Sequence, residues 1–180
     1  MITSVANQKV KQVVAWQTKA KERKKDDIFL VEGMKMFEEA PEGSVKEVYI
    51  EETLLEKLEK DGELYKKLER VGFEVVSSEV FKKMSDTQTP QGILAIVERP
   101  EYPFEELIKI EKPLFVILED LQDPGNLGTI IRTGEGAGVS AVFMTKNTVD
   151  IYNPKTIRAT MGSIYRVPFA IVEDVEETIA

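Results

Sequence analysis

The chain of 180 residues contains neither cysteine nor histidine. Without cysteine it can form no disulfide, and it offers no thiolate for zinc binding or for a covalent intermediate. Without histidine it has no serine–histidine pair and no imidazole ligand. We therefore expect no metal site and no chemistry that depends on a thiolate or imidazole nucleophile.

Long apolar segments are also missing. No apolar run approaches the roughly 20 residues that a membrane-spanning helix requires. Met1-Ile-Thr-Ser is followed by lysines and not by the apolar core of a signal peptide. We expect a cytoplasmic protein with no membrane partner, and the 42% apolar content suits one or two globular domains.

Positive charge is scarce overall, because the net charge is −8, but it is gathered in two places. Residues 1–25 carry seven lysines and arginines against Glu22 alone, and residues 126–168 carry five against Glu135 and Asp150. Phosphate contacts act within a Debye length of about 8 Å, so local basic patches on an acidic protein can bind nucleic acid. A lysine-rich helix is equally well explained as a solvated face.

Strands and helices alternate in the first hundred residues. Apolar and β-branched segments predict strands at 28–31, 45–50, 73–76 and 93–97. Helical patterns cover 4–22, 34–39, 54–70 (broken near Gly62) and 78–84. In the first of these, Val10, Val13, Val14 and Trp16 should face inward. The alternation predicts a mostly parallel sheet with helices on both faces.

A second domain follows a proline-containing segment. Pro100 and Pro103 disfavour helix and central strand, so residues 100–112 are expected to link a domain at 1–99 to another at 113–180. The second domain shows strands at 114–118, 141–145 and 167–172 and helices at 126–137 and 154–160. The glycines between 134 and 138 follow a helix and precede a strand, which is the reverse of a dinucleotide-binding turn. They are expected to end the helix.

The most informative segment runs from residue 118 to residue 133. Asp123-Pro124-Gly125 is typical of a turn, and Asn126 is expected to cap a helix that begins at Leu127. Leu127, Ile130 and Ile131 share one face, and Arg132 lies off that face near the start of the helix. The pattern predicts a strand, a loop and a helix that carries a cation.

This segment resembles motif 1 of the SpoU (TrmH-type) RNA ribose methyltransferases, in which asparagine, glycine and arginine recur at the spacing of Asn126, Gly128 and Arg132. The segment from Asn153 to Pro168 resembles motif 2, with Thr160 where serine is usual. The first hundred residues resemble the substrate-binding domain that precedes the catalytic domain in many members. That likeness rests on Ile2-Thr-Ser-x-x-Asn7, Phe29-Leu-Val-Glu32-Gly33 and Ser85-Asp86-x-x-x-Pro90-Gln-Gly92.

The resemblance implies an α/β fold: an N-terminal α/β RNA-binding domain, then a SPOUT methyltransferase domain with a mostly parallel sheet, truncated before its C-terminal trefoil knot. It implies S-adenosylmethionine-dependent 2′-O-ribose methylation of RNA, with ribosomal RNA as the expected partner and a homodimer as the full-length assembly. Most of the S-adenosylmethionine pocket would lie beyond Ala180. Residues 173–180 read as a helix barely begun, with Val175 and Ile179 on one face, so we expect an inactive fragment. The alternative is a non-catalytic RNA-binding module.

The resemblance also implies roles for individual residues. Asn126 and Arg132 are the candidate catalytic residues, and the candidate RNA-binding residues are Lys21, Arg23, Lys24, Lys155 and Arg158. Arg132 could act as a base, but a guanidinium is almost never neutral, so a clamp on phosphate is an equally economical role.

Simpler interpretations of several residues stand beside these roles. Arg132 could pair with Glu135 on the helix surface, and Asn126 could be only a cap. Thr160 and Ser163 could be turn residues, and Glu32-Gly33 could be a turn from strand to helix.

Overall fold

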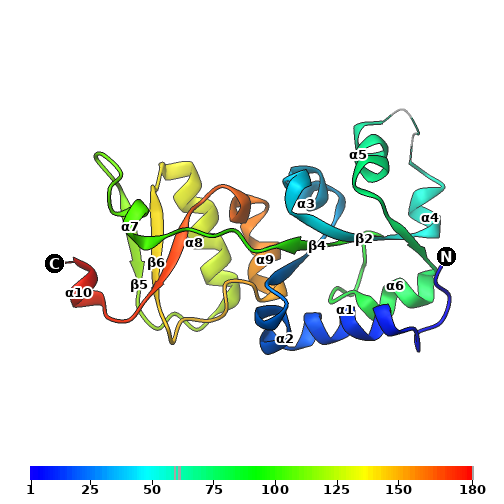
Figure 1. The fold of residues 1–180 in the computed structure, drawn as a ribbon, viewed down its shortest axis with the longest axis horizontal. Coiled ribbons are helices and arrows are strands. Elements are labelled where there is room, and N and C mark those ends of the chain that lie inside the picture. Colours follow the sequence, from blue (N-terminus) through cyan, green and yellow to red (C-terminus); the bar gives the residue numbers. More distant parts are fainter. Residues whose placement is uncertain (59, 61, 180) are drawn as a thin grey trace. The chain divides into compact units, whose positions relative to one another are not determined.

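The computed structural model describes residues 1–58, 60 and 62–179, which form two compact units, Met1–Arg99 and Pro100–Ala180 (Figure 1). Each unit contains one β-sheet, of four strands in the first and three in the second. Within the described residues no helix combines the length and the apolar composition needed to cross a lipid bilayer.

The sheet of the first unit has the strand order β1-β4-β2-β3. Its strands are β1 (Ile28–Glu32), β2 (Val45–Glu51), β3 (Glu74–Val76) and β4 (Ile93–Glu98). Only β2 and β3 are parallel, since β4 lies between β1 and β2 and runs antiparallel to both. The prediction of a mostly parallel sheet is therefore wrong for this unit. Alternation of strands with helices does not fix the direction in which the last strand inserts.

The helices of the first unit partly match the predicted ranges. They are α1 (Gln8–Thr18), α2 (Ala20–Lys25), α3 (Met34–Glu39), η1 (Glu42–Ser44), α4 (Glu52–Leu55), α5 (Glu63–Val71) and α6 (Ser78–Met84). The predicted helix at 4–22 begins later, because the Asn7 side chain caps α1 by accepting from the Lys9 backbone N–H at 2.8 Å. It is also broken at Lys19, whose backbone is extended. The expected break near Gly62 separates α4 from α5; residues 59 and 61 lie outside the described residues.

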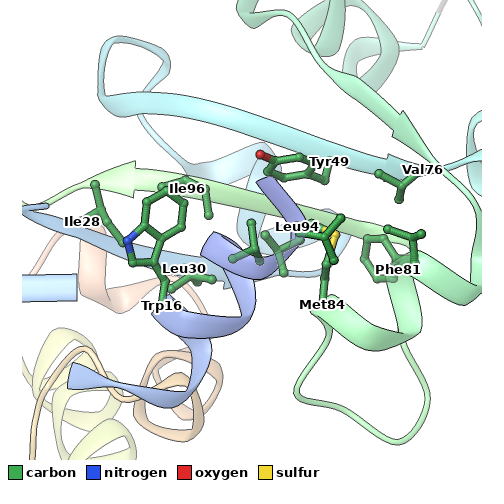
Figure 2. Packing of buried hydrophobic residues seen from close by; sticks show 12 residues of the cluster. Trp16, Ile28, Leu30, Tyr49, Val76, Phe81, Met84, Leu94 and Ile96 are labelled. Carbon is green, nitrogen blue, oxygen red and sulfur yellow. The ribbon is translucent and has the colours of Figure 1, made fainter. Parts of the chain in front are cut away.

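Helices α1 and α6 cover one face of this sheet (Figure 2). Val10 and Val13 are fully buried and Trp16 nearly so, whereas Val14 is only half-buried. They pack with buried side chains from the strands and from α6, namely Ile28, Leu30, Tyr49, Val76, Val80, Phe81, Met84, Leu94 and Ile96. Spacings of three along the helix and two along the strands bring these residues together, as expected for amphipathic elements.

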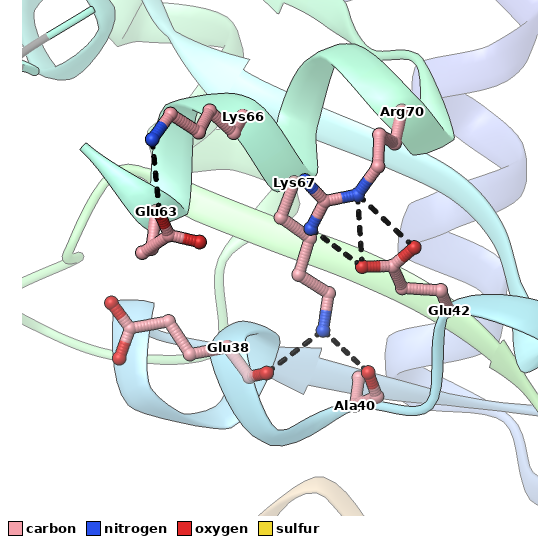
Figure 3. A network of polar contacts seen from close by, with 7 residues as sticks. All are labelled: Glu38, Ala40, Glu42, Glu63, Lys66, Lys67 and Arg70. Carbon is pink, nitrogen blue, oxygen red and sulfur yellow. Dashed lines mark hydrogen bonds and ion pairs between the residues drawn. The ribbon is translucent and has the colours of Figure 1, made fainter. Parts of the chain in front are cut away.

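A buried lysine fixes α5 to α3 (Figure 3). The Lys67 ammonium donates to the backbone carbonyl of Glu38 at 2.8 Å and to that of Ala40, and it lies 5.1 Å from the centre of the Phe37 ring. These carbonyls belong to the end of α3, where backbone acceptors have no partner within the helix. Burial lowers the pKa of Lys67. These contacts explain why a charged residue lies inside the unit.

The sheet of the second unit is parallel throughout, with the order β5-β6-β7. Its elements are α7 (Phe104–Leu107), β5 (Phe115–Leu118), α8 (Pro124–Ala137), β6 (Ala141–Thr145), α9 (Pro154–Thr160), η2 (Ser163–Tyr165), β7 (Phe169–Val172) and α10 (Val175–Ile179). The parallel sheet predicted for this unit is confirmed. Helix α8 ends at Gly138, whose left-handed backbone (φ 76°) confirms the predicted stop. In α10, Val175 is half-buried; the side chain of Ile179 and all of Ala180 lie outside the described part.

The segment that we expected to be a linker contains α7. Tyr102, Phe104 and Leu107 from this segment pack against Ala141, Phe143 and Val172 of the sheet. Figure 1 shows α7 and α8 on opposite sides of β5 and β6. Pro100 and Pro103 keep a helix from beginning earlier, and Pro103 is the N-cap of the short helix that follows.

Candidate active site

Helix α8 begins earlier than its sequence suggested. Asp123 is the N-cap, and its side chain accepts from the backbone N–H of Asn126 at 2.7 Å. Pro124 occupies the first helical position, which suits its fixed φ and missing N–H. The prediction that Asn126 caps a helix starting at Leu127 is therefore wrong. Asn126 lies inside the first turn and is exposed.

The loop before α8 is tied to the loop after β6. The backbone N–H of Asp120 donates to the Thr145 hydroxyl at 2.9 Å, and this hydroxyl donates to the Asp120 carboxylate at 2.8 Å. The Gln122 amide donates to the carbonyls of Asp120 at 2.9 Å and Asn147 at 2.8 Å. Both loops follow the carboxyl ends of parallel strands, the edge at which open α/β sheets bind ligands.

Helices α8 and α9 approach closely at Gly128. A Cβ atom there would lie 2.5 Å from the Thr156 carbonyl oxygen and 2.6 Å from the Ala159 Cβ. Only glycine permits this separation. The glycine of the first motif thus serves helix packing, and it brings the two motifs side by side.

Two further contacts join the motifs, one on each side of Gly128. At the start of α8, the Lys155 ammonium lies 3.9 Å from the Asp123 carboxylate, and both side chains are exposed. In the last turn of α8, the Glu135 carboxylate accepts from the Ser163 hydroxyl and from the Arg166 guanidinium. The two motifs therefore run alongside each other in the same direction.

Glu135 connects the two motifs, a role that the sequence did not indicate. Hydrogen bonds from Arg166 and then from Ser163 hold the pKa of Glu135 below its ordinary value. Glu135 is the only acidic residue in α8, and the sequence offered a pair with Arg132 as the simpler interpretation of that arginine. The structure does not form this alternative pair, because Glu135 is bonded to Ser163 and Arg166.

Arg132 is exposed, and in the part of the chain that the structure describes its side chain forms no hydrogen bond or ion pair. Among the candidates on α9, Lys155 is exposed and Arg158 is half-buried. Arg132 is therefore a cation of α8 available to a ligand, and the neighbouring helix α9 contains two further basic residues, Lys155 and Arg158.

The hydroxyls of the second motif have structural partners. Thr160 is fully buried and donates to the Ile157 carbonyl at 2.6 Å, and Ser163 is buried against Glu135. Met161 and Gly162 adopt left-handed backbone conformations between them. These observations favour the interpretation of Thr160 and Ser163 as turn residues over substrate contacts.

In the first unit, the three basic residues that we expect to bind RNA differ in their exposure. Lys21 and Lys24 are exposed, whereas Arg23 is 3% exposed. The Arg23 guanidinium donates to the carbonyl of Trp16 at 2.6 Å and to that of Gln17 at 3.3 Å, which satisfies acceptors at the end of α1. Arg23 is thus placed in the interior and not on the surface where we had expected it to meet RNA.

The remaining motifs of the first unit meet at the end of β1. The Glu32 carboxylate accepts from the hydroxyls of Ser85 (2.8 and 2.9 Å) and Thr87 (2.8 Å). Gly33 has φ of 109°, and a Cβ there would lie 2.9 Å from the Gln91 side-chain oxygen. Glu32-Gly33 is a turn from strand to helix, as predicted, and it holds the loop before β4.

The second unit also contains a groove that is lined by residues outside the two motifs. A groove of about 470 Å³ borders the sheet face next to α7 and is lined mainly by Phe104, Ile108, Phe115, Phe143 and Glu177. Among the described residues no group of three or more acidic side chains is arranged to hold a metal ion.

Comparison with known proteins gives two adjoining family matches. Residues 7–95 match the MRM3-like substrate binding domain, and residues 113–180 match the SpoU rRNA Methylase family. The chain is 39% identical over 171 residues to 23S rRNA (guanosine(2553)-2′-O)-methyltransferase RlmP of Bacillus subtilis (strain 168), covering 93% of this chain and 63% of that protein. It is 39% identical over 166 residues to human rRNA methyltransferase 3, mitochondrial, covering 87% of this chain and 38% of that protein.

The fold likeness extends to solved structures. The AdoMet-bound rRNA methyltransferase from Sinorhizobium meliloti superposes with a TM-score of 0.82 at 30% identity, covering 99% of this chain and 66% of that chain. The chain thus spans less than two thirds of the length of these relatives.

Proposed function

We propose, for a chain that joins an MRM3-like substrate-binding domain to a SpoU methylase family domain, that the protein transfers a methyl group from S-adenosylmethionine to a ribose 2′-hydroxyl of RNA. The observation that carries this proposal is Arg132, an exposed cation without an ion pair in the described residues, on the helix that runs beside the second motif. The names of the relatives support ribosomal RNA as the substrate class.

Arg132 can contribute in two ways that need no proton transfer. Its guanidinium can bind a phosphate next to the target ribose with two parallel N–H donors. It can also stabilise the negative charge that develops on the ribose oxygen as the hydroxyl loses its proton. A role as base is less favourable, because an arginine side chain stays protonated at any ordinary pH.

Neighbouring residues position the ligand. Lys155 and Arg158 lie three residues apart on α9 and can contact phosphates beside Arg132. Asn126 can orient a ligand group near the start of α8, since its side chain is exposed there. Lys21 and Lys24 supply exposed charge on the first unit for additional backbone contacts.

The groove beside α7 does not fit S-adenosylmethionine. The groove beside α7 is lined by apolar and acidic side chains, and the residues that line it offer no cation for the carboxylate of the cofactor. The cofactor would supply a methyl group activated by a positively charged sulfur. We propose no contact between the cofactor and a residue of this chain. The trefoil knot, the homodimer and the cytoplasmic location remain predictions.

Methyl transfer is tested with tritiated S-adenosylmethionine and ribosomal RNA, on the natural gene product and on residues 1–180. Label that survives as alkali-resistant dinucleotides marks a 2′-O-methyl group, because alkaline cleavage needs a free 2′-hydroxyl. RNA binding without transfer by the natural gene product would favour the alternative, a non-catalytic RNA-binding module. Titration calorimetry of residues 1–180 with S-adenosylmethionine tests the expected inactivity of this chain, which micromolar binding would contradict.

A further inference from the structure

Within the described residues Arg132 is unpaired, although Glu135 on the same helix stands at a spacing that favours an ion pair. Residues three apart on a helix lie side by side, and an arginine and a glutamate at this spacing ordinarily attract each other. Glu135 is the only acidic residue of α8 and stands three positions after Arg132. The expected partner of Arg132 is therefore present on the same helix but bonded elsewhere.

Both oxygens of the Glu135 carboxylate are occupied. The Arg166 Nε donates to Oε1 and its Nη2 donates to Oε2 at 3.2 Å, which makes a two-pronged contact. The Ser163 hydroxyl also donates to Oε2, and Ser163 is 2% exposed. Two parallel bonds from a guanidinium fix geometry better than a single flexible contact along a helix surface. The turn from Gly162 to Arg166 thus presents matched donors to Glu135.

We propose that Arg166 and Ser163 sequester the Glu135 carboxylate and thereby keep the Arg132 guanidinium free to bind RNA. In this arrangement Glu135 and Arg166 are positioning residues, and neither needs to touch the substrate. The inference rests on the proposed function, because it assigns the freed guanidinium to RNA phosphate.

The charge balance supports the same assignment. An uncompensated carboxylate one helical turn from a phosphate-binding arginine would repel the phosphate and attract the arginine. Arg166 cancels this charge at contact distance, while its own guanidinium is directed to Glu135. The second motif therefore adjusts the electrostatics of the first without approaching the ligand.

Two variants separate sequestration from a general structural role. Arg166→Met removes the guanidinium but keeps an unbranched side chain, so Glu135 is released toward Arg132. Arg166→Met/Glu135→Gln removes the released charge as well. We expect the single variant to bind a fluorescein-labelled RNA hairpin about five- to tenfold more weakly, with its log K against log salt slope reduced by about one phosphate contact. The double variant should recover most of the affinity and the slope.

A second measurement needs no RNA. In the NMR spectrum of protein with labelled arginine, the Arg132 Nε–H is assigned by its loss in Arg132→Lys. We expect it to exchange rapidly with water in the wild type and in the double variant, and to be protected in Arg166→Met. If Arg166→Met does not fold, Arg166→Gln, which keeps a donor but loses the charge, replaces it in both measurements.

The outcomes distinguish the two proposals. If Arg132→Ala leaves RNA affinity unchanged, the proposed RNA site fails, while the Arg132 exchange rates still decide whether Glu135 captures the arginine. If Arg132→Ala weakens binding but Arg166→Met leaves both the exchange rate and the salt slope unchanged, sequestration is wrong. A double variant as weak as the single one also overturns it, because a lost structural contact is not repaired by losing a second one.

Discussion

A Cβ atom on Gly128 would come within 2.5 Å of the Thr156 carbonyl oxygen, so glycine at 128 and the backbone of α9 determine each other's position. This contact holds the two motifs at the separation on which the candidate site depends.

Replacing Gly128 with alanine should destabilise the second unit by about 1–3 kcal/mol, the usual cost of overpacking, because a backbone oxygen cannot move aside as a side chain can. Gly136→Ala is the matched control within α8, since no atom lies within 4 Å of a Cβ there. It should be neutral or stabilise by up to about 1 kcal/mol. Urea unfolding measures both, and equal effects would contradict the packing role.

Arg23→Ala should lower the free energy of unfolding of the first unit by about 1–3 kcal/mol, because the carbonyls of Trp16 and Gln17 lose a buried donor. Lys24→Ala, on the same helix but exposed, should change it by no more than about 0.5 kcal/mol. Chemical denaturation compares the two variants. A stable Arg23→Ala protein with impaired RNA binding would restore the original expectation for Arg23.

Replacing Lys21 and Lys24 together with alanine should weaken RNA binding and reduce the log K against log salt slope by up to about two phosphate contacts. Both side chains are exposed, so stability should be unaffected. Fluorescence anisotropy over a salt series provides the slope. An unchanged slope would identify this face as merely solvated.

Stability at low pH should depend on Glu135. Because Arg166 and Ser163 hold its pKa below the ordinary value in the folded protein, its contribution is present above the unfolded pKa and is lost as pH falls through the folded pKa. Glu135→Gln should therefore be less stable than the wild type at pH 7, and the difference should shrink in acid below about pH 4. Urea titrations at several pH values test this, with Glu105→Gln as a control for the loss of one negative charge. If the difference in unfolding free energy between Glu135→Gln and the wild type were constant with pH, the charged contact between Glu135 and Arg166 would be ruled out.

In the natural gene product, Arg132→Ala should lower kcat by on the order of 100-fold, the cost of removing one donor to developing negative charge, with little effect on cofactor affinity. Arg132→Lys should retain partial activity if the residue clamps phosphate, since a point charge remains without the two-pronged geometry. If Arg132 were a base, the lysine variant should gain activity with rising pH, because its pKa of about 10.4 is easier to reach. Wild-type activity of the lysine variant at every pH would exclude both roles.

Much of the fold could be predicted because it rests on local patterns. The buried strands 28–32 and 93–98 and the helix closed by Gly138 were visible as apolar runs and turn residues. The start of α8 was misplaced because Asp123 and Asn126 are both good caps, and only Pro124 at the first helical position decides between them. The direction of β4 had no local signal, since it depends on which strands flank it.

The sequence by itself determined the order of the elements and the presence of a cation at Arg132, because these follow from spacing and residue type. Only the tertiary structure decided which charges are available. Arg23 is buried because the chain turns at Lys19 and carries it back to the end of α1. Within the described residues Arg132 has no ionic partner, because Ser163 and Arg166, which lie 28 and 31 positions after Glu135, occupy that carboxylate. Partners so distant in sequence are chosen by packing, and packing exists only once the chain has folded.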